Sequence, residues 1–210
     1  MKMELEIRAL SPALIEDYLG FFDGAAFSDH PEWSFCYCTY YHLGKQDEEA
    51  LEAQCAGRWT RDILRNTAID LIKTGRLNGY LAYSDGRVLG WCNAGDKKSF
   101  KKLCENRGVW DTGDETPVKS IVCFIVAPGA RRMGVASALL ARASRDASRE
   151  GYRVLEAYPA VGALDCYQHY HGHPEMYEKQ GFIKHRAFET YCVYRKALSP
   201  NGAEDASGQP

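Results

Sequence analysis

The segment most able to bind an anion lies between an apolar run and an amphipathic run. Residues 126–136 read Val-Ala-Pro-Gly-Ala-Arg-Arg-Met-Gly-Val-Ala. Where a strand turns into a helix, successive backbone N–H groups are free and the helix dipole is positive, and both favour phosphate. Small residues at Gly134 and Ala136 would let the anion approach the backbone, and Arg131 and Arg132 add charge. The segment predicts a phosphate or pyrophosphate site, although glycine at such a turn also serves tight packing.

A second group of residues is typical of metal ligands. His169, His171 and His173 stand at alternate positions, so an extended backbone would point the three imidazoles the same way. Gly172 and Pro174 favour a turning loop instead. We therefore expect no metal site there.

Cysteines offer a third kind of chemistry. Cys36-Tyr37-Cys38, with His42 nearby, lacks the second cysteine pair that makes zinc modules recognisable. Cys123 lies in a strongly apolar run, where a covalent acyl-cysteine route competes with simple packing of a small side chain. We expect these thiols to be core residues or the wall of a pocket.

Periodicity predicts the elements that position these residues. Apolar runs and alternation predict strands at residues 3–8, 80–83, 88–92, 118–127, 153–158, 182–188 and 190–195. Helical spacing predicts helices at residues 12–23, 47–74, 134–150 and 174–180. Asp85-Gly86 predicts a tight hairpin turn because both central residues need positive φ. Residues 27–45 are predicted to form a loop or short irregular helix, and residues 95–116 a polar connection.

Composition narrows the class of protein. The chain has 210 residues, is 45% hydrophobic and balances 26 basic against 28 acidic side chains. This balance argues against a nucleic-acid partner, despite the basic residues between Lys97 and Lys102. With no apolar run of membrane-spanning length and no apolar leader, we expect no membrane partner and a cytoplasmic location, where the eight cysteines stay reduced. We expect one domain over residues 1–198 and a disordered tail over 199–210.

Two separated motifs resemble the GNAT superfamily of acyl-CoA-dependent N-acyltransferases. Residues 131–136 fit its Arg/Gln-x-x-Gly-x-Gly/Ala signature, and residues 176–182, Met-Tyr-Glu-Lys-Gln-Gly-Phe, look like its Tyr-Glu-Lys-x-Gly-Phe segment. The order of elements agrees over about residues 3–197. The resemblance implies an α/β fold of the α+β type: a mixed, mostly antiparallel sheet flanked by helices, with strands 118–127 and 153–158 splayed to form a coenzyme cleft. Residues 29–38 resemble the front loop of an uncharacterised bacterial branch, which identifies no acceptor.

The resemblance also implies a reaction and its residues. An acetyl group would pass from acetyl-CoA, as cosubstrate, to a primary amine of a small molecule or protein in a ternary complex, with no metal required. Tyr177 matches the tyrosine that protonates the departing thiolate. The amides of Phe124, Ile125 and Val126 would pair with the pantetheine arm and polarise the thioester carbonyl. The pyrophosphate would be held by Arg131, Arg132, Met133, Gly134, Val135 and Ala136.

The base and the acceptor stay open. An amine must lose its proton before it attacks a thioester, so a base is useful. The candidates are Glu32, His30, His42, His169, His171 and Glu156; we favour Glu32, because the loop that carries it forms one wall of the acceptor site in the family. The aromatic cluster over residues 33–41 either shapes a pocket or packs the loop. A non-catalytic coenzyme-binding or regulatory module is the alternative function, and edge strands near the C-terminus would permit a homodimer.

Overall fold

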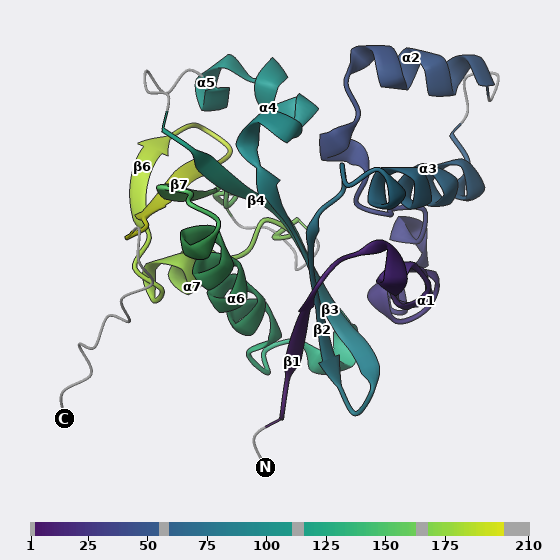
Figure 1. Ribbon diagram of the computed structural model, residues 1–210, viewed down its shortest axis with the longest axis horizontal. Coiled ribbons are helices and arrows are strands. Elements are labelled where there is room, and N and C mark those ends of the chain that lie inside the picture. Colours follow the sequence, from purple (N-terminus) through teal and green to yellow (C-terminus); the bar gives the residue numbers. More distant parts are fainter. Residues whose placement is uncertain (1–2, 55–58, 111–115, 163–167, 200–210) are drawn as a thin grey trace.

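The computed structural model describes residues 3–54, 59–110, 116–162 and 168–199, which form one seven-stranded sheet with helices against both faces (Figure 1). The spatial order is β1-β2-β3-β4-β5-β7-β6, and every neighbouring pair is antiparallel except β4 with β5. The predicted mixed, mostly antiparallel sheet is therefore confirmed. The strands are β1 (Glu6–Ala9), β2 (Gly79–Ser84), β3 (Arg87–Asp96), β4 (Val118–Val126), β5 (Val154–Ala157), β6 (Ile183–Ala187) and β7 (Cys192–Ala197).

The hairpin between β2 and β3 forms where the sequence predicts it. Asp85 and Gly86 adopt φ values of 49° and 72°, the left-handed pair that a two-residue hairpin turn requires. This hairpin brings β3 beside β4, the most buried strand of the described chain.

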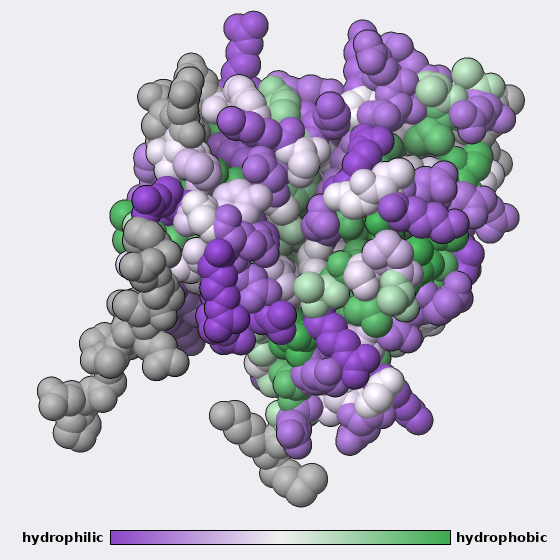
Figure 2. All heavy atoms as spheres, in the orientation of Figure 1, coloured by the Kyte–Doolittle hydropathy of each residue, from purple (hydrophilic) through white to green (hydrophobic). Residues whose placement is uncertain are grey.

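Each face of the sheet has its own core. Helices α1 (Ile15–Asp23) and α3 (Arg61–Lys73) cover the face that carries Leu81, Trp91 and Cys123. Helix α6 (Val135–Arg149) covers the other face, together with the short helix α7 (Pro174–Glu178). Figure 2 shows the outward surface of α6 as strongly hydrophilic, as its arginines on the side opposite Leu139 and Ala143 predict.

Strand β4 pairs with β5 only over the first part of β4. The pairing joins Val118–Ile121 to Val154–Ala157 and stops there, while β4 continues to Val126. Beyond this point the backbone N–H of Phe124 donates a hydrogen bond to the carbonyl of Tyr170 at 2.6 Å. The predicted splay is therefore present, and Tyr170, which precedes α7, lies along it.

Two sequence predictions differ from the structure, and a third is not tested by it. The single helix expected over residues 47–74 is wrong: α2 (Lys45–Gln54) and α3 are separate, and α3 begins after Thr60, whose hydroxyl accepts a hydrogen bond from the N–H of Ile63. Residues 95–116 contain the 3-10 turn η5 (Lys97–Ser99) and two short helices, α4 (Lys101–Glu105) and α5 (Arg107–Trp110). The tail predicted to be disordered falls, from residue 200, outside the described residues.

The irregular segment near the N-terminus agrees with its prediction. It contains the 3-10 turns η2 (Ala25–Phe27), η3 (Pro31–Trp33) and η4 (Tyr40–His42), preceded by η1 (Pro12–Leu14) at the start of α1. We call residues 27–43 the front loop. Among the described residues, no helix combines the length and the apolar character needed to cross a membrane.

Candidate functional site

The turn between β4 and α6 has the backbone geometry of an anion site. It runs through the 3-10 turn η6 (Pro128–Ala130) to Gly134, which caps α6. Arg132 and Gly134 have φ values of 61° and 86°, and left-handed residues of this kind turn successive N–H groups inward. No carbonyl of the described residues accepts a hydrogen bond from the N–H groups of residues 132–137. These six donors are therefore available to a ligand.

A cavity of about 550 Å³, which we call the turn cavity, lies in front of these donors. Its walls come from the turn, from one face of β4 and from the chain before α7. Among the predicted coenzyme residues, Ile125 and Met133 do not line it. Those that do are Phe124, Val126, Arg131, Arg132, Gly134, Val135 and Ala136.

Arg131 connects this turn to the front loop. Its guanidinium forms an ion pair with Asp29 at 2.7 Å, and its Nε donates to the carbonyl of Val126 at 3.2 Å. The Arg131 side chain thus links the turn between β4 and α6 to the front loop.

The hydroxyl of Tyr177 lies directly behind the turn cavity. The ring of Tyr177 is fully buried, between Phe124 and Phe182, and its O–H donates to the carbonyl of His171. Burial raises the pKa of the Tyr177 hydroxyl well above its usual value, so the group keeps its proton at neutral pH. A protonated phenol is a proton donor.

One short segment covers two of the predicted catalytic groups. The carbonyl of Tyr170 accepts from the N–H of Phe124, and the next carbonyl, of His171, accepts from Tyr177. We call residues 169–173 the covering segment. The left-handed Gly172, with φ of 83°, lets this segment pass over the Tyr177 ring, because a Cβ at residue 172 would lie 2.7 Å from Met176 and 3.1 Å from the Tyr177 hydroxyl.

Two chambers lie on the other side of β4. The front chamber has about 310 Å³ and is lined by Cys123 and Ile125 of β4 and by aromatic rings of the front loop. The side chamber has about 480 Å³ and reaches Tyr158 and His171. The chambers share four aromatic side chains, Trp33, Tyr40, Tyr41 and Tyr170. The aromatic cluster therefore shapes a pocket, which the sequence left undecided.

His171 is the predicted base candidate that faces the chambers most directly. Its Nε2 lies 2.9 Å from the hydroxyl of Tyr41. Burial lowers the pKa of His171 to about 4, so the imidazole is neutral at physiological pH and one ring nitrogen can accept a proton.

Glu32 takes a different position. Its side chain is 64% exposed, its carboxylate bonds Nδ1 of His30 at 2.7 Å, and it lines neither chamber. The hydrogen bond from His30 lowers the pKa of the Glu32 carboxyl.

The remaining base candidates are engaged elsewhere. Glu156 is fully buried and bonds both Lys97 and Arg195 at 2.6 Å. His42 is buried against Asn93, and burial lowers its pKa to about 4. His169 lines the turn cavity. Among these groups, the structure brings only His171 to a chamber wall.

The three alternate histidines do not converge. The rings of His169 and His173 lie 4.0 Å apart and face the turn cavity, whereas His171 packs against Tyr170 and Tyr41. Within the described ranges, no three histidine, cysteine or acidic side chains are grouped as a metal site.

The basic run between Lys97 and Lys102 is not a continuous surface patch. Lys97 is buried on Glu156, and Lys102 forms an ion pair with Glu48 at 2.7 Å. The structure therefore turns two of these charges toward carboxylates rather than toward a nucleic acid.

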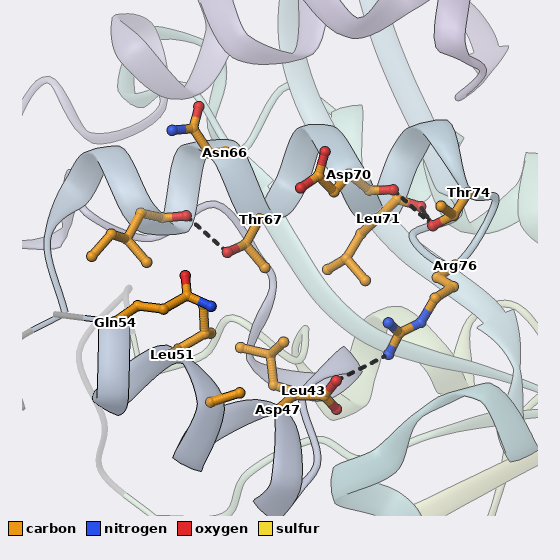
Figure 3. A pocket seen from close by; sticks show the side chains of 12 residues that line it. Leu43, Asp47, Leu51, Gln54, Asn66, Thr67, Asp70, Leu71, Thr74 and Arg76 are labelled. Atoms are coloured by element: carbon orange, nitrogen blue, oxygen red, sulfur yellow. Dashed lines mark hydrogen bonds and ion pairs between the residues drawn. The ribbon is translucent and has the colours of Figure 1, made fainter.

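A further cavity, of about 430 Å³, lies between α2 and α3 (Figure 3). Leu43, Leu51 and Leu71 point into it, and Asp47 and Arg76 form an ion pair of 3.9 Å at its edge. None of the predicted site residues lines this cavity, so it is separate from the candidate site.

Sequence reasoning missed several residues at this site. Tyr158 bonds both Ser120 and Glu156 at 2.7 Å, and Tyr170 supplies the carbonyl that faces Phe124. These partners are separated by up to 46 residues in the chain, and no local pattern signals such contacts. In the sequence, only the many aromatic residues of the front loop indicated a pocket wall.

Comparison with known proteins agrees with this architecture. The model of the acetyltransferase (GNAT) family matches residues 44–182. No curated protein matches the chain. The fold is similar to a GNAT-family acetyltransferase from Streptococcus pneumoniae, with 15% identity, 93% of this chain and 100% of the other covered, and a TM-score of 0.52. It is also similar to the PaiA N-acetyltransferase of Thermoplasma acidophilum, solved in complex with coenzyme A, with 16% identity, 93% and 100% coverage, and a TM-score of 0.50.

Proposed function

Because this chain belongs to the GNAT acetyltransferase family, we propose that it transfers an acetyl group from acetyl-CoA to a primary amine by direct attack in a ternary complex. The observation that supports this most is the turn cavity. It combines six available backbone N–H donors with one face of the end of β4, where β4 no longer pairs with β5. Backbone donors at a helix N-terminus suit a pyrophosphate, and an open strand edge suits the amides of a pantetheine arm.

The protein's own groups would stabilise one developing charge and supply one proton. As the amine nitrogen attacks the thioester carbon, negative charge grows on the carbonyl oxygen, and the N–H of Phe124 is placed to stabilise it once it exchanges Tyr170 for the substrate. When the C–S bond breaks, the thiolate takes the proton of Tyr177, which burial keeps protonated. The covering segment must shift for both steps.

His171 is the base that the geometry supports best. It is neutral, it lies at a chamber wall, and Tyr41 holds one ring nitrogen. Glu32 stays a prediction. Activity measurements distinguish the two candidates: His171→Gln lowers kcat/KM about 10²- to 10⁴-fold if His171 is the base, whereas Glu32→Gln leaves kcat/KM within twofold.

The chambers favour an acceptor with an apolar body. The described residues that line the front chamber are aromatic, aliphatic or thiol-bearing, and none is acidic. Among the described residues that line the side chamber, the one charged side chain is Lys102, which Glu48 and Glu105 neutralise. A polyamine or aminoglycoside would need carboxylates to offset its charges. We therefore propose a monoamine carried on an aryl or alkyl group. A homodimer and a cytoplasmic location stay predictions.

A specific observation also favours the alternative function. The covering segment engages both Phe124 and Tyr177, so a protein that binds the coenzyme without moving this segment would be a non-catalytic module.

One pair of measurements tests the proposal. Calorimetry with coenzyme A measures binding, and release of free thiol from acetyl-CoA measures turnover with phenethylamine, hexylamine, spermidine and kanamycin. The proposal expects binding, with turnover highest for the first two amines. Binding without turnover supports the module, and the absence of binding contradicts both functions.

A further inference from the structure

Three cysteines from two distant segments line the front chamber. Cys36 and Cys38 come from the front loop and Cys123 from β4, and all three thiols are free. Cys38 and Cys123 line this chamber together, and Asn93, whose side-chain amide contacts Cys38, is the cross-strand partner of Cys123. The chamber therefore brings a potential nucleophile and a second thiol together, and its 310 Å³ has room for several small molecules the size of water.

Hydrogen-bond donors converge on the sulfur of Cys38. The side-chain Nδ2 of Asn93 lies 3.3 Å from Cys38 Sγ, and an amide nitrogen can only donate. Asn93 is fully buried, and His42 holds it from the other side at 3.1 Å. Donors aimed at a sulfur favour its thiolate form.

The backbone of Cys38 is held in an unusual conformation. Its φ is 54°, in the left-handed region that residues with a Cβ rarely adopt. Asn93 Nδ2 also bonds the Cys38 carbonyl at 3.1 Å, and Tyr18 bonds the preceding carbonyl at 2.6 Å. Strained residues that their surroundings fix in this way cluster at functional sites.

The three thiols differ in acidity. Burial alone would raise the pKa of Cys38, but the hydrogen bonds from Cys123, Asn93 and Trp91 outweigh burial and leave the pKa below its usual value. Burial raises the pKa of Cys36 to about 12. The hydrogen bond that Cys123 donates to Cys38, together with burial, raises the pKa of Cys123 well above its usual value.

We propose that Cys38 is a peroxide-reactive thiol and Cys123 its resolving partner, so that oxidation links the front loop to β4 by a Cys38–Cys123 disulfide across the front chamber. The observation behind the proposal is that Asn93 Nδ2 lies 3.3 Å from the Cys38 sulfur, in a cavity that Cys38 and Cys123 line together.

The chemistry balances with a hydroperoxide as oxidant. The Cys38 thiolate attacks one oxygen of hydrogen peroxide, and the O–O bond breaks. This step forms a sulfenic acid on Cys38 and releases hydroxide. The Cys123 thiol loses its proton and attacks that sulfur; the S–O bond breaks, and the departing hydroxide takes a proton to give water. The two thiols lose two electrons in total, and the peroxide is reduced to water.

The test uses the full chain and needs no coenzyme. The protein is treated with hydrogen peroxide, free thiols are blocked with N-ethylmaleimide, and a tryptic digest is analysed by mass spectrometry without reduction. Cleavage after Lys45 and Arg131 places Cys38 in the peptide of residues 9–45 and Cys123 in that of residues 120–131. The proposal expects these two peptides to be linked, and the link to disappear with dithiothreitol.

Cys36→Ser is the matched control, since Cys36 lies in the same peptide and the same chamber. The link should persist in Cys36→Ser and be lost in Cys38→Ser and Cys123→Ser. In the unmodified protein, which avoids any folding defect of a variant, limiting N-ethylmaleimide should label Cys38 at least tenfold faster than Cys36. Labelling of Cys38 no faster than Cys36, or a link that survives Cys38→Ser, would overturn the proposal. A loss of amine acetylation on oxidation is a further consequence, which rests on the proposed function; the mass-spectrometric result does not.

Discussion

The two faces of β4 serve the candidate site in different ways. Phe124 and Val126 point to the turn cavity, where the available groups are backbone N–H donors from one continuous segment. Cys123 and Ile125 point to the front chamber, where the walls are side chains from elements far apart in the chain. Alternation along a strand sends neighbouring residues to opposite faces. One strand thus separates a site built from backbone from a site built from side chains.

This difference predicts different sensitivities. The turn cavity should depend on backbone conformation and tolerate changes of side chain, whereas the chambers should depend on side-chain size and charge. Arg131 and Asp29 join the two sides by an ion pair. Four predictions test the contrast, beginning with the largest effect.

Tyr177→Phe tests the group behind the turn cavity. Loss of a general acid lowers kcat by about 10²- to 10⁴-fold, while the Kd for coenzyme A should change less than twofold because the hydroxyl does not line the cavity. Tyr194→Phe is the control, since Tyr194 packs beside Tyr177 and donates its own hydroxyl to Glu178. Thiol release measures kcat, and equal kcat for Tyr177→Phe and the unmodified protein would make Tyr177 purely structural.

Acid should destabilise the chambers, which are built from side chains, more than the turn cavity, which is built from backbone groups. Burial lowers the pKa of His42 and of His171 to about 4 in the folded protein, whereas the unfolded chain takes up the proton near pH 6.5. The stability contributed by each neutral imidazole is therefore present above pH 6.5 and lost as the pH falls toward 4. At pH 5 the loss is roughly 2 kcal/mol for each residue.

Urea unfolding at pH 7.5 and pH 5 measures this loss. His42→Gln and His171→Gln should each make the free energy of unfolding less dependent on pH, and the exposed His30→Gln should not. An unchanged pH dependence in both buried variants would contradict the assigned burial of neutral imidazoles.

Gly134→Ala tests the backbone geometry of the turn. At φ of 86° an alanine strains the turn by about 1–2 kcal/mol, which should weaken coenzyme A binding about tenfold by calorimetry. Gly129→Ala lies in the same turn, has no positive φ and meets nothing within 4 Å, so its Kd should stay within twofold. If both variants bind equally, left-handed geometry at Gly134 does not shape the site.

Tyr40→Ala tests the chambers, which are built from side chains, and has the smallest expected effect. Tyr40 is 56% exposed at the rim that both chambers share, so its loss should raise the KM for phenethylamine about three- to tenfold without changing the Kd for coenzyme A. Ile183→Ala is the control, because the Ile183 side chain on β6 is 71% exposed and lines neither chamber. A shift in coenzyme affinity instead of KM would mean that the two faces are not independent.

The local parts of the fold followed from the sequence. Asp85-Gly86 marked the hairpin, the apolar run marked β4 to within one residue, and the glycine-containing turn marked the start of α6. The extent of the second predicted helix did not follow, because the apolar spacing continues past the end of α2 and across the cap at Thr60.

By itself, the sequence determined the turn that offers backbone donors, since strand periodicity, glycine conformation and helix capping act among neighbouring residues. Only the tertiary structure decided which side chains meet. Sheet order placed Cys38 beside Cys123 and the covering segment beside Phe124 and Tyr177, and it left Glu32 in solvent. Contacts between residues up to 130 positions apart, such as Tyr41 with His171, depend on how the elements pack, which no local pattern encodes.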